Sequence, residues 1–289
     1  MKLIRENFDT RRSAVTGLDQ IRIENLVVFA NHGVFPEENA LGQKFVISCT
    51  LYLNTEQAGK TDDLESSVNY GTIAHLLNEK MKEKTFKLIE AEADFLAESI
   101  LLSDSKIQAV ALELKKPWAP IGLPLDCASL TVFRQWHEAY IALGSNMGDK
   151  EKYLEDAVTG LKQTHGCVVE ACSSWMRTAP YGYTAQDEFL NGALKLRTLL
   201  SPHALLDRLH ELEQEANRRR EIHWGPRTLD LDILLYDDLC LDDNDLCIPH
   251  VDMKNREFVL APLVEIAPYK HHPVYQITLK EMLDDLRAE

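Results

Sequence analysis

Two aspartates separated by one leucine are the residues of this sequence with the clearest chemical meaning. Asp230 and Asp232 lie in the stretch 228–235, which is otherwise apolar and partly alternating and therefore predicts a β-strand. Side chains on a strand point alternately to opposite faces, so both carboxylates share one face, with Cα atoms roughly 6–7 Å apart. Two carboxylates on a buried strand face repel each other and lose solvation, and they therefore require nearby positive charge.

Arginines supply this positive charge. Arg227 stands three residues before the first aspartate, and three consecutive arginines occupy positions 218–220. Carboxylate oxygens beside arginines suit Mg²⁺ that carries phosphate groups. The chemistry indicated is transfer of a group from a nucleotide, although a structural salt-bridge cluster remains the alternative for this motif alone.

Two further motifs favour the chemical interpretation. The segment Pro249–Phe258 contains a histidine, a lysine and an arginine that can bind phosphate, and it ends in an aromatic residue. The motif Leu143-Gly144-Ser145-Asn146 ends a predicted strand, where its glycine permits close backbone approach. In this order the three motifs resemble the 6-hydroxymethyl-7,8-dihydropterin pyrophosphokinase family, from about residue 139 to the C-terminus.

This resemblance implies an ATP-dependent reaction in a three-layer α-β-α, ferredoxin-like domain. Two Mg²⁺ ions would bind Asp230 and Asp232 and bridge the ATP phosphates. The hydroxymethyl oxygen of the pterin would attack the β-phosphorus, so that AMP leaves. Arg218 and Arg227 would act in catalysis by neutralising the triphosphate. The implied ATP-binding residues are Arg218, Arg220, Trp224, Arg227, His250 and Arg256, of which Trp224 shapes a loop that closes over the nucleotide.

The same resemblance implies a pterin site. Asn191 can offer both a donor and an acceptor to the ring edge, and Phe189 and Phe258 can stack on the two ring faces. Phe189 stands where the family often has tyrosine. Thr178 would contribute backbone or hydroxyl contacts, and Glu213 is expected to contact an arginine. The alternative for the two aromatics is a place in the apolar core.

Four polar residues of the N-terminal half have no evident structural role, namely Glu38, Tyr70, Glu90 and Lys116. Glu38 is expected in the loop that follows His32-Gly33. Taken singly, each of the four reads as a surface or capping residue. The motifs that contain them are His32-Gly33, Glu38 with Gly42-Gln43, Val68-Asn69-Tyr70-Gly71, Leu88-Ile89-Glu90 and Lys116-Pro117-Trp118-Ala119-Pro120-Ile121. Together they resemble dihydroneopterin aldolase from about residue 18 to residue 134.

The aldolase resemblance implies a retro-aldol cleavage that requires neither metal nor other cofactor, because the ring C=N bond accepts the electrons. Lys116 would belong to the general-base system through a water, with a Schiff-base nucleophile as the alternative. Tyr70 would pass a proton to and from the carbon centre, and Glu38 would orient the lysine or the substrate hydroxyls. Glu90 would accept two N–H bonds from the pterin edge; if the motif register slips, Glu92 or Asp94 takes that place.

The spacing of apolar residues predicts the strands and helices that carry these residues. The N-terminal half reads strand, strand, helix, helix, strand, strand, which indicates an α+β layer. These elements are expected at 21–29, 44–53, 70–82, 88–102, 110–114 and 128–133. We expect an N-terminal extension over 1–17, an aldolase domain over 18–135 and a pyrophosphokinase domain over 138–289. The family's tunnelling fold (ββααββ) forms its site between subunits, which implies a homo-oligomer, with an octamer of two stacked tetramers as one form.

Composition limits the partners. The chain has 289 residues and a formal net charge of −15, which disfavours general binding to nucleic acid or acidic membranes. No apolar run reaches transmembrane length, and residues 1–17 lack the core of a signal peptide. Its six cysteines have no short metal spacing, so we expect reduced thiols that are mostly packing residues. These features favour a cytoplasmic protein.

The two resemblances support each other. The product of the aldolase, 6-hydroxymethyl-7,8-dihydropterin, is the substrate of the pyrophosphokinase, so the chain is expected to be a bifunctional enzyme of folate biosynthesis that takes 7,8-dihydroneopterin and ATP. The alternatives for the N-terminal half are a neopterin-phosphate epimerase or a non-catalytic scaffold. A zinc-dependent cyclohydrolase is disfavoured because its His/Cys ligand set is missing.

Overall fold

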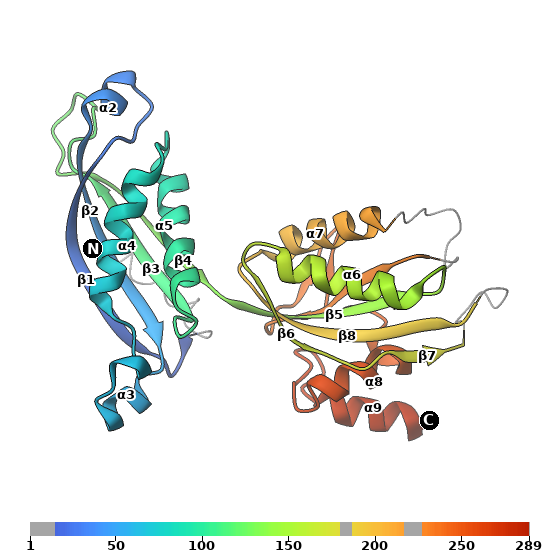
Figure 1. Ribbon diagram of the computed structural model, residues 1–289. Coiled ribbons are helices and arrows are strands. Elements are labelled where there is room, and N and C mark those ends of the chain that lie inside the picture. The colour runs from blue at the N-terminus through green and yellow to red at the C-terminus, as the bar shows by residue number, and fades with distance from the viewer. Residues whose placement is uncertain (1–14, 180–186, 217–226, 289) are drawn as a thin grey trace. The chain divides into compact units, whose positions relative to one another are not determined.

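The computed structural model describes residues 15–179, 187–216 and 227–288. The chain forms two compact units, with the boundary between Trp136 and His137 (Figure 1). Within the described ranges, no helix combines the length and the apolar character needed to cross a membrane. Residues 1–14 of the expected N-terminal extension lie outside these ranges.

The N-terminal unit is a four-stranded antiparallel sheet covered by two helices (Figure 1). The strands are β1 (Asp19–Ala30), β2 (Gln43–Leu53), β3 (Ala109–Lys116) and β4 (Ala128–Gln135), in spatial order β1-β2-β3-β4. The helices α4 (Tyr70–Glu83) and α5 (Ile89–Ser103) follow β2 in sequence. Every second residue of β2 is buried, as expected for a strand with one face in the core, and residues four positions apart are buried on α4, as expected for one face of a helix. The predicted ββααββ order is confirmed.

One short helix changes the expected position of Glu38. The sequence placed it in a loop, but it lies in α2 (Pro36–Leu41). Pro36 stands at the first helical position, where its missing N–H costs nothing. The Glu38 carboxylate accepts a hydrogen bond from the N–H of Phe35 at 3.1 Å, which caps the helix start. Two other short elements, α3 (Glu56–Thr61) and η2 (Leu64–Ser66), connect β2 to α4.

The C-terminal unit has a ferredoxin-like βαββαβ topology. Its elements in chain order are β5 (His137–Ser145), α6 (Lys150–Gln163), β6 (Cys167–Cys172), β7 (Met176–Thr178), β8 (Phe189–Thr198), α7 (Pro202–Glu215) and β9 (Asp230–Tyr236). The strands pair antiparallel in the order β6-β8-β5-β9, and β7 also pairs with β8. The first and third strands of the repeat are therefore central, which confirms the implied fold.

Helices cover both faces of this sheet (Figure 1). One apolar core lies between the sheet and α6 and α7, and a second lies between the sheet and α8 (Glu257–Ile266) and α9 (Leu279–Ala288). Between β9 and α8 the chain forms the hairpin β10 (Leu241–Asp242) and β11 (Cys247–Ile248), followed by η3 (Met253–Asn255). The three-layer α-β-α prediction is confirmed.

The cysteines do not behave as the sequence suggested. All six are free, but only Cys49 and Cys167 are buried. Burial raises the pKa of the Cys49 thiol to about 12, which makes it an inert packing group. Three others, Cys172, Cys240 and Cys247, are exposed, so the expectation that most are packing thiols is wrong.

Candidate active sites

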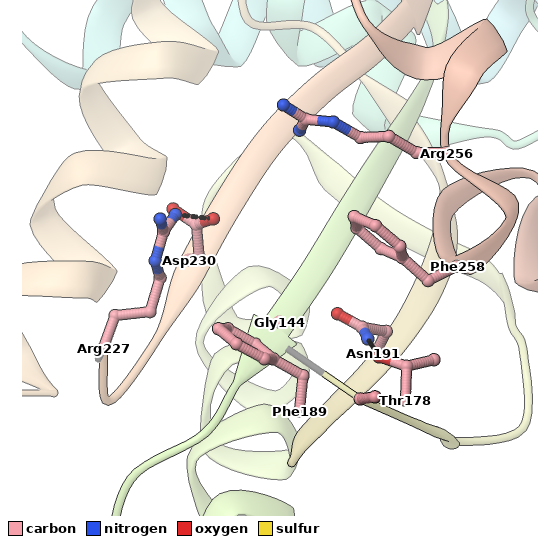
Figure 2. A pocket seen from close by; sticks show the side chains of 9 residues that line it. Gly144, Thr178, Phe189, Asn191, Arg227, Asp230, Arg256 and Phe258 are labelled. Carbon is pink, nitrogen blue, oxygen red and sulfur yellow. Dashed lines mark hydrogen bonds and ion pairs between the residues drawn. The ribbon is translucent and has the colours of Figure 1, made fainter. Parts of the chain in front are cut away.

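A cavity in the C-terminal unit collects most of the described residues assigned to pterin and phosphate binding (Figure 2). It is lined by Gly144, Thr178, Ala179, Phe189, Asn191, Arg227, Asp230, Arg256 and Phe258. These residues come from the strands β5, β7, β8 and β9, from the segment before β9 and from the start of α8. Residues more than a hundred positions apart in the sequence are thus brought to one end of the sheet.

The floor of the cavity is the central strand β5. Gly144 stands opposite Asn191 on β8 and opposite Asp230 on β9. A Cβ atom at this position would lie 3.2 Å from Asn191 Oδ1 and 3.9 Å from Asp230 Cβ. The glycine therefore leaves space for a ligand between the two neighbouring strands, whereas the sequence suggested only a close backbone approach at the strand end.

The side of the cavity that carries the residues assigned to the pterin, here called the pterin side, contains a hydrogen bond between two side chains. Asn191 Nδ2 donates to Thr178 Oγ1 at 2.7 Å, and this bond sets which way the amide faces. The rings of Phe189 and Phe258 project into the cavity from β8 and from the first turn of α8 (Figure 2). Both aromatics line the cavity, and Phe258 also packs against the core between the sheet and α8 and α9. Their stacking role stays a prediction.

The charged side contains Arg227 and Asp230, which form an ion pair. Asp232 lies on the same sheet face, opposite Ala142 of β5, because strand side chains alternate. Leu229, Leu231 and Ile233 enter the opposite core, as expected from the sequence. Asp232 is one pleat further along β9 and does not line the cavity.

Arg256 and His250 line two different cavities. Arg256 lines the cavity and donates to Asp252 at 2.8 Å. His250 lines a second cavity, whose described lining also includes Lys254 and His272. The chain from 249 to 258 thus contributes to both cavities, and His250 does not share the first one with Asp230.

Three of the residues assigned to ATP binding, Arg218, Arg220 and Trp224, lie outside the described residues. Glu213, expected to contact an arginine, is buried on α7, and its Oε1 accepts the N–H of Leu231 at 2.8 Å. This bond holds the backbone between the two aspartates of β9, a contact that the sequence did not reveal.

The N-terminal unit joins two of the residues assigned to aldolase chemistry. Lys116, at the end of β3, places Nζ 2.6 Å from Glu38 Oε1, and both side chains are almost buried. Gln43 also donates to Glu38 Oε1, at 2.9 Å. Burial raises the pKa of the Glu38 carboxyl, but its hydrogen bonds and the charge of Lys116 lower it more, so the pKa lies below the ordinary value.

The other two aldolase residues are exposed. Tyr70 begins α4, where the Asn69 side chain caps the helix, and it is 65% exposed. Glu90 is exposed in the first turn of α5. Glu92, one of the two alternatives to Glu90, is fully buried and lies 3.0 Å from His32 Nε2.

The second alternative, Asp94, accepts a 2.6 Å bond from Arg134. The buried Glu92 carboxylate lies against His32 and the Asp94 carboxylate is paired with Arg134, whereas Glu90 is exposed in the first turn of α5. Glu90 stays the predicted anchor of the pterin, with Glu92 and Asp94 as the alternatives. The contact of Gln43 with Glu38 was not predicted, although Gly42-Gln43 is one of the motifs that resemble the aldolase.

Two family models match the chain. One is described as 7,8-dihydro-6-hydroxymethylpterin-pyrophosphokinase and matches residues 140–268. The other is described as dihydroneopterin aldolase and matches residues 21–133. The two matches fall on either side of the boundary between the compact units.

Curated relatives match one or both regions. The 2-amino-4-hydroxy-6-hydroxymethyldihydropteridine pyrophosphokinase of Bacillus subtilis (strain 168) is 49% identical over 128 residues, which cover 44% of this chain and 77% of that protein. Bifunctional protein FolKE of Lactococcus lactis subsp. lactis is 46% identical, with coverage of 44% of this chain and 36% of the relative. Folic acid synthesis protein FOL1 of Dictyostelium discoideum is 30% identical across 92% of this chain. The chain spans 44% of the length of FOL1, so it is similar to part of that larger protein.

Solved structures match each region separately. The Escherichia coli dihydroneopterin aldolase in complex with neopterin has 27% identity and a TM-score of 0.38, and the match covers 40% of this chain and 98% of that one. A Plasmodium falciparum HPPK-DHPS structure has 13% identity and a TM-score of 0.42, and the match covers 53% of this chain and 46% of that one.

Proposed function

Because this chain belongs to the 7,8-dihydro-6-hydroxymethylpterin-pyrophosphokinase family and also carries a dihydroneopterin aldolase region, we propose that it catalyses two successive steps of folate biosynthesis. The first step cleaves 7,8-dihydroneopterin into 6-hydroxymethyl-7,8-dihydropterin and glycolaldehyde. The second transfers pyrophosphate from ATP to the hydroxymethyl group and releases AMP. The observation that carries the proposal is the convergence of the assigned pterin and phosphate residues on one cavity.

For the transfer step, the pterin would lie over Gly144 between the rings of Phe189 and Phe258. Asn191 would bind the polar edge of the heterocycle, with its orientation set by Thr178. The hydroxymethyl group would then face the charged side of the cavity. Arg227 and Arg256 line that side and would neutralise the phosphate charge that develops there.

Asp230 and Asp232 fit Mg²⁺ because they offer two hard oxygen donors on one face of β9. Among the residues that the structure describes, no cluster of three or more acidic, histidine or cysteine side chains could hold a metal. The remaining ligands would therefore come from ATP phosphates and water, as is usual for Mg²⁺. When bound, the ion would offset the negative charge of the phosphates.

The nucleotide would extend from Asp230 toward the second cavity, where His250 and Lys254 supply positive or hydrogen-bonding groups beside apolar side chains. Arg218, Arg220 and Trp224 stay predictions for the triphosphate and its covering loop. A cytoplasmic location and the lack of binding to nucleic acid or membranes also stay predictions from composition.

For the aldol step, the Glu38 carboxylate lies 2.6 Å from Lys116 Nζ and would orient the lysine. Lys116 would act in the general-base system through a water. Tyr70 would exchange a proton with the carbon centre, and Glu90 would bind the amino-pyrimidinone edge.

We infer a homo-oligomer because the N-terminal unit exposes both site residues and large apolar side chains. Val27 and Phe29 of β1 are 59% and 55% exposed, and Trp118, after β3, is 60% exposed. β1 and β4 are also the edges of the sheet, and an exposed edge can pair with another chain. A neighbouring subunit would complete the site around Tyr70 and Glu90. Light scattering of the purified chain tests this, with an octamer as one form of the homo-oligomer.

The direct test is incubation with dihydroneopterin, ATP and Mg²⁺, followed by mass analysis for pterin diphosphate, AMP and glycolaldehyde. When each activity is assayed with its own pterin substrate, Asp232→Ala should abolish pyrophosphate transfer and spare aldol cleavage, whereas Lys116→Ala should do the reverse. Equal loss of both activities in folded variants would contradict two independent sites. Absence of glycolaldehyde, with AMP still formed when 6-hydroxymethyl-7,8-dihydropterin is supplied in place of dihydroneopterin, would favour the epimerase or scaffold alternatives. A borohydride-trapped adduct would indicate a Schiff base at Lys116.

A further inference from the structure

Asn146 makes a set of contacts that the proposed chemistry does not use. It follows the last residue of β5 and is 1% exposed. Its side-chain Oδ1 accepts the N–H of Arg227 at 2.8 Å, and its own N–H donates to the carbonyl of Arg227 at 3.1 Å. Its Nδ2 donates to the carbonyl of Asp187 at 3.4 Å. One buried amide therefore contacts two distant segments of the chain.

These two segments carry the two sides of the cavity. Asp187 leads into Phe189 and Asn191, which form the pterin side. Arg227 is itself on the charged side and leads into Asp230. Asn146 does not line the cavity, so any effect on the reaction passes through these neighbours.

We infer that Asn146 is a positioning residue for pyrophosphate transfer, an inference that rests on the proposed function of the C-terminal unit. Asn146 follows β5, the strand that forms the cavity floor. From there it fixes the distance between Arg227 and the segment that begins at Asp187. This distance matters because the pterin carries the attacking oxygen, whereas Arg227 neutralises the charge of the phosphate that is attacked. Small displacements between such groups are costly to the rate.

The amide group is suited to this role for a chemical reason. An asparagine side chain offers an acceptor and a donor in one plane, and here the acceptor serves Arg227 while the donor serves Asp187. An aspartate of the same shape would keep the acceptor but would place a second oxygen against the Asp187 carbonyl. An alanine would lose both side-chain bonds.

The two substitutions should therefore differ in kinetics. Asn146→Ala should lower kcat for AMP formation by about tenfold or more, because the side-chain bond to the Arg227 N–H is lost and only the backbone bond to Arg227 remains. Asn146→Asp should chiefly raise the KM for the pterin, because only the contact with the Asp187 segment is lost. Glycolaldehyde release by the N-terminal unit should stay at the wild-type rate in both variants, which serves as an internal control for an intact chain.

A double-mutant cycle separates positioning from general stability. If Asn146 acts through Arg227, then Asn146→Ala should lower kcat much less in the Arg227→Ala background than in the wild type. A residue with only a structural role would lower kcat by the same factor in both backgrounds. The matched control is Thr198→Val, which removes a buried hydroxyl that accepts from the Leu200 N–H at the opposite end of the β5–β8 pair. This control should lower Tm without changing kcat.

Hydrogen exchange gives a readout that does not depend on activity. In Asn146→Ala the amides of residues 187–191 and 227–232 should exchange faster than in the wild type, and those of Thr198→Val should not. Wild-type kinetics and unchanged exchange in Asn146→Ala, or equal factors in both backgrounds of the cycle, would overturn the inference. If the wild-type chain forms no AMP, the proposed function fails, and the exchange data still decide whether Asn146 holds the two segments.

Discussion

Replacing Gly144 with alanine should weaken pterin binding while leaving the fold intact. The added methyl group would lie 3.2 Å from Asn191 Oδ1, closer than an ordinary van der Waals contact, on the floor of the cavity. Asn191 cannot move away freely, because its Nδ2 donates to Thr178 Oγ1 at 2.7 Å. Relief of the contact therefore strains or breaks that hydrogen bond.

The expected magnitude follows from that bond. A typical hydrogen bond contributes about 0.5–1.5 kcal/mol net, so its loss should weaken binding by roughly two- to tenfold. The nucleotide contacts on β9 should change less, because the methyl group would lie 3.9 Å from Asp230 Cβ, an ordinary contact distance. We therefore expect a change in pterin affinity with little change in ATP affinity.

Titration calorimetry with 6-hydroxymethyl-7,8-dihydropterin, in the presence of Mg²⁺ and a non-hydrolysable ATP analogue, measures this change. Gly160→Ala is the matched control, because its methyl group would overlap the Leu212 side chain in the core between α6 and α7. The control should lower Tm without weakening pterin binding. An unchanged pterin Kd in a folded Gly144→Ala protein would refute the role of the glycine as a floor that must stay open.

Three further outcomes are expected. Arg227→Ala should lower kcat for pyrophosphate transfer by about a hundredfold, as removal of one positioned charge-stabilising group commonly does, and should leave glycolaldehyde release unchanged; loss of both activities would refute separate sites. Glu38→Gln should lower the aldol cleavage rate and also stability, because the lowered pKa of Glu38 means that its ionised form favours folding. The Tm difference from the wild type should be largest above the ordinary glutamate pKa and shrink as pH falls through the lowered pKa, and a difference that grows toward acid would contradict this sign. Glu92→Leu should raise Tm by an amount that reflects about 1 kcal/mol or more, because it removes a fully buried carboxylate whose oxygens accept no hydrogen bond from the described residues, while His32 keeps its bonds with Met81 and Phe86. A fall in Tm would show that the pair of Glu92 and His32 is net stabilising.

Local patterns predicted most of the fold. The four strands and two long helices of the N-terminal unit lie where periodicity placed them, because burial on one side of an element imposes a period on its own residues. The shared face of Asp230 and Asp232 follows for the same reason. Glu38 was misplaced because α2 has only six residues, too few for a helical period to appear.

The site could be predicted only in part. Residue types and motifs indicated the stacking rings, the amide and the arginine that now line one cavity. They did not indicate the separation of His250 into a second cavity, nor the contacts of Gln43, Glu213 and Asn146. Each of these contacts joins one side chain to another segment, and motif spacing gives no information about such distances.

The sequence by itself indicated the chemistry proposed for the chain, through its motifs, and determined which residues share a face within one strand or helix. Both depend on neighbours along the chain. The tertiary structure alone decided that Gly144 is the floor between Asn191 and Asp230, and that Asn146 joins Asp187 to Arg227. Such juxtapositions depend on the pairing register of strands that are distant in sequence, and this register is set by burial of the whole sheet between its two helical layers.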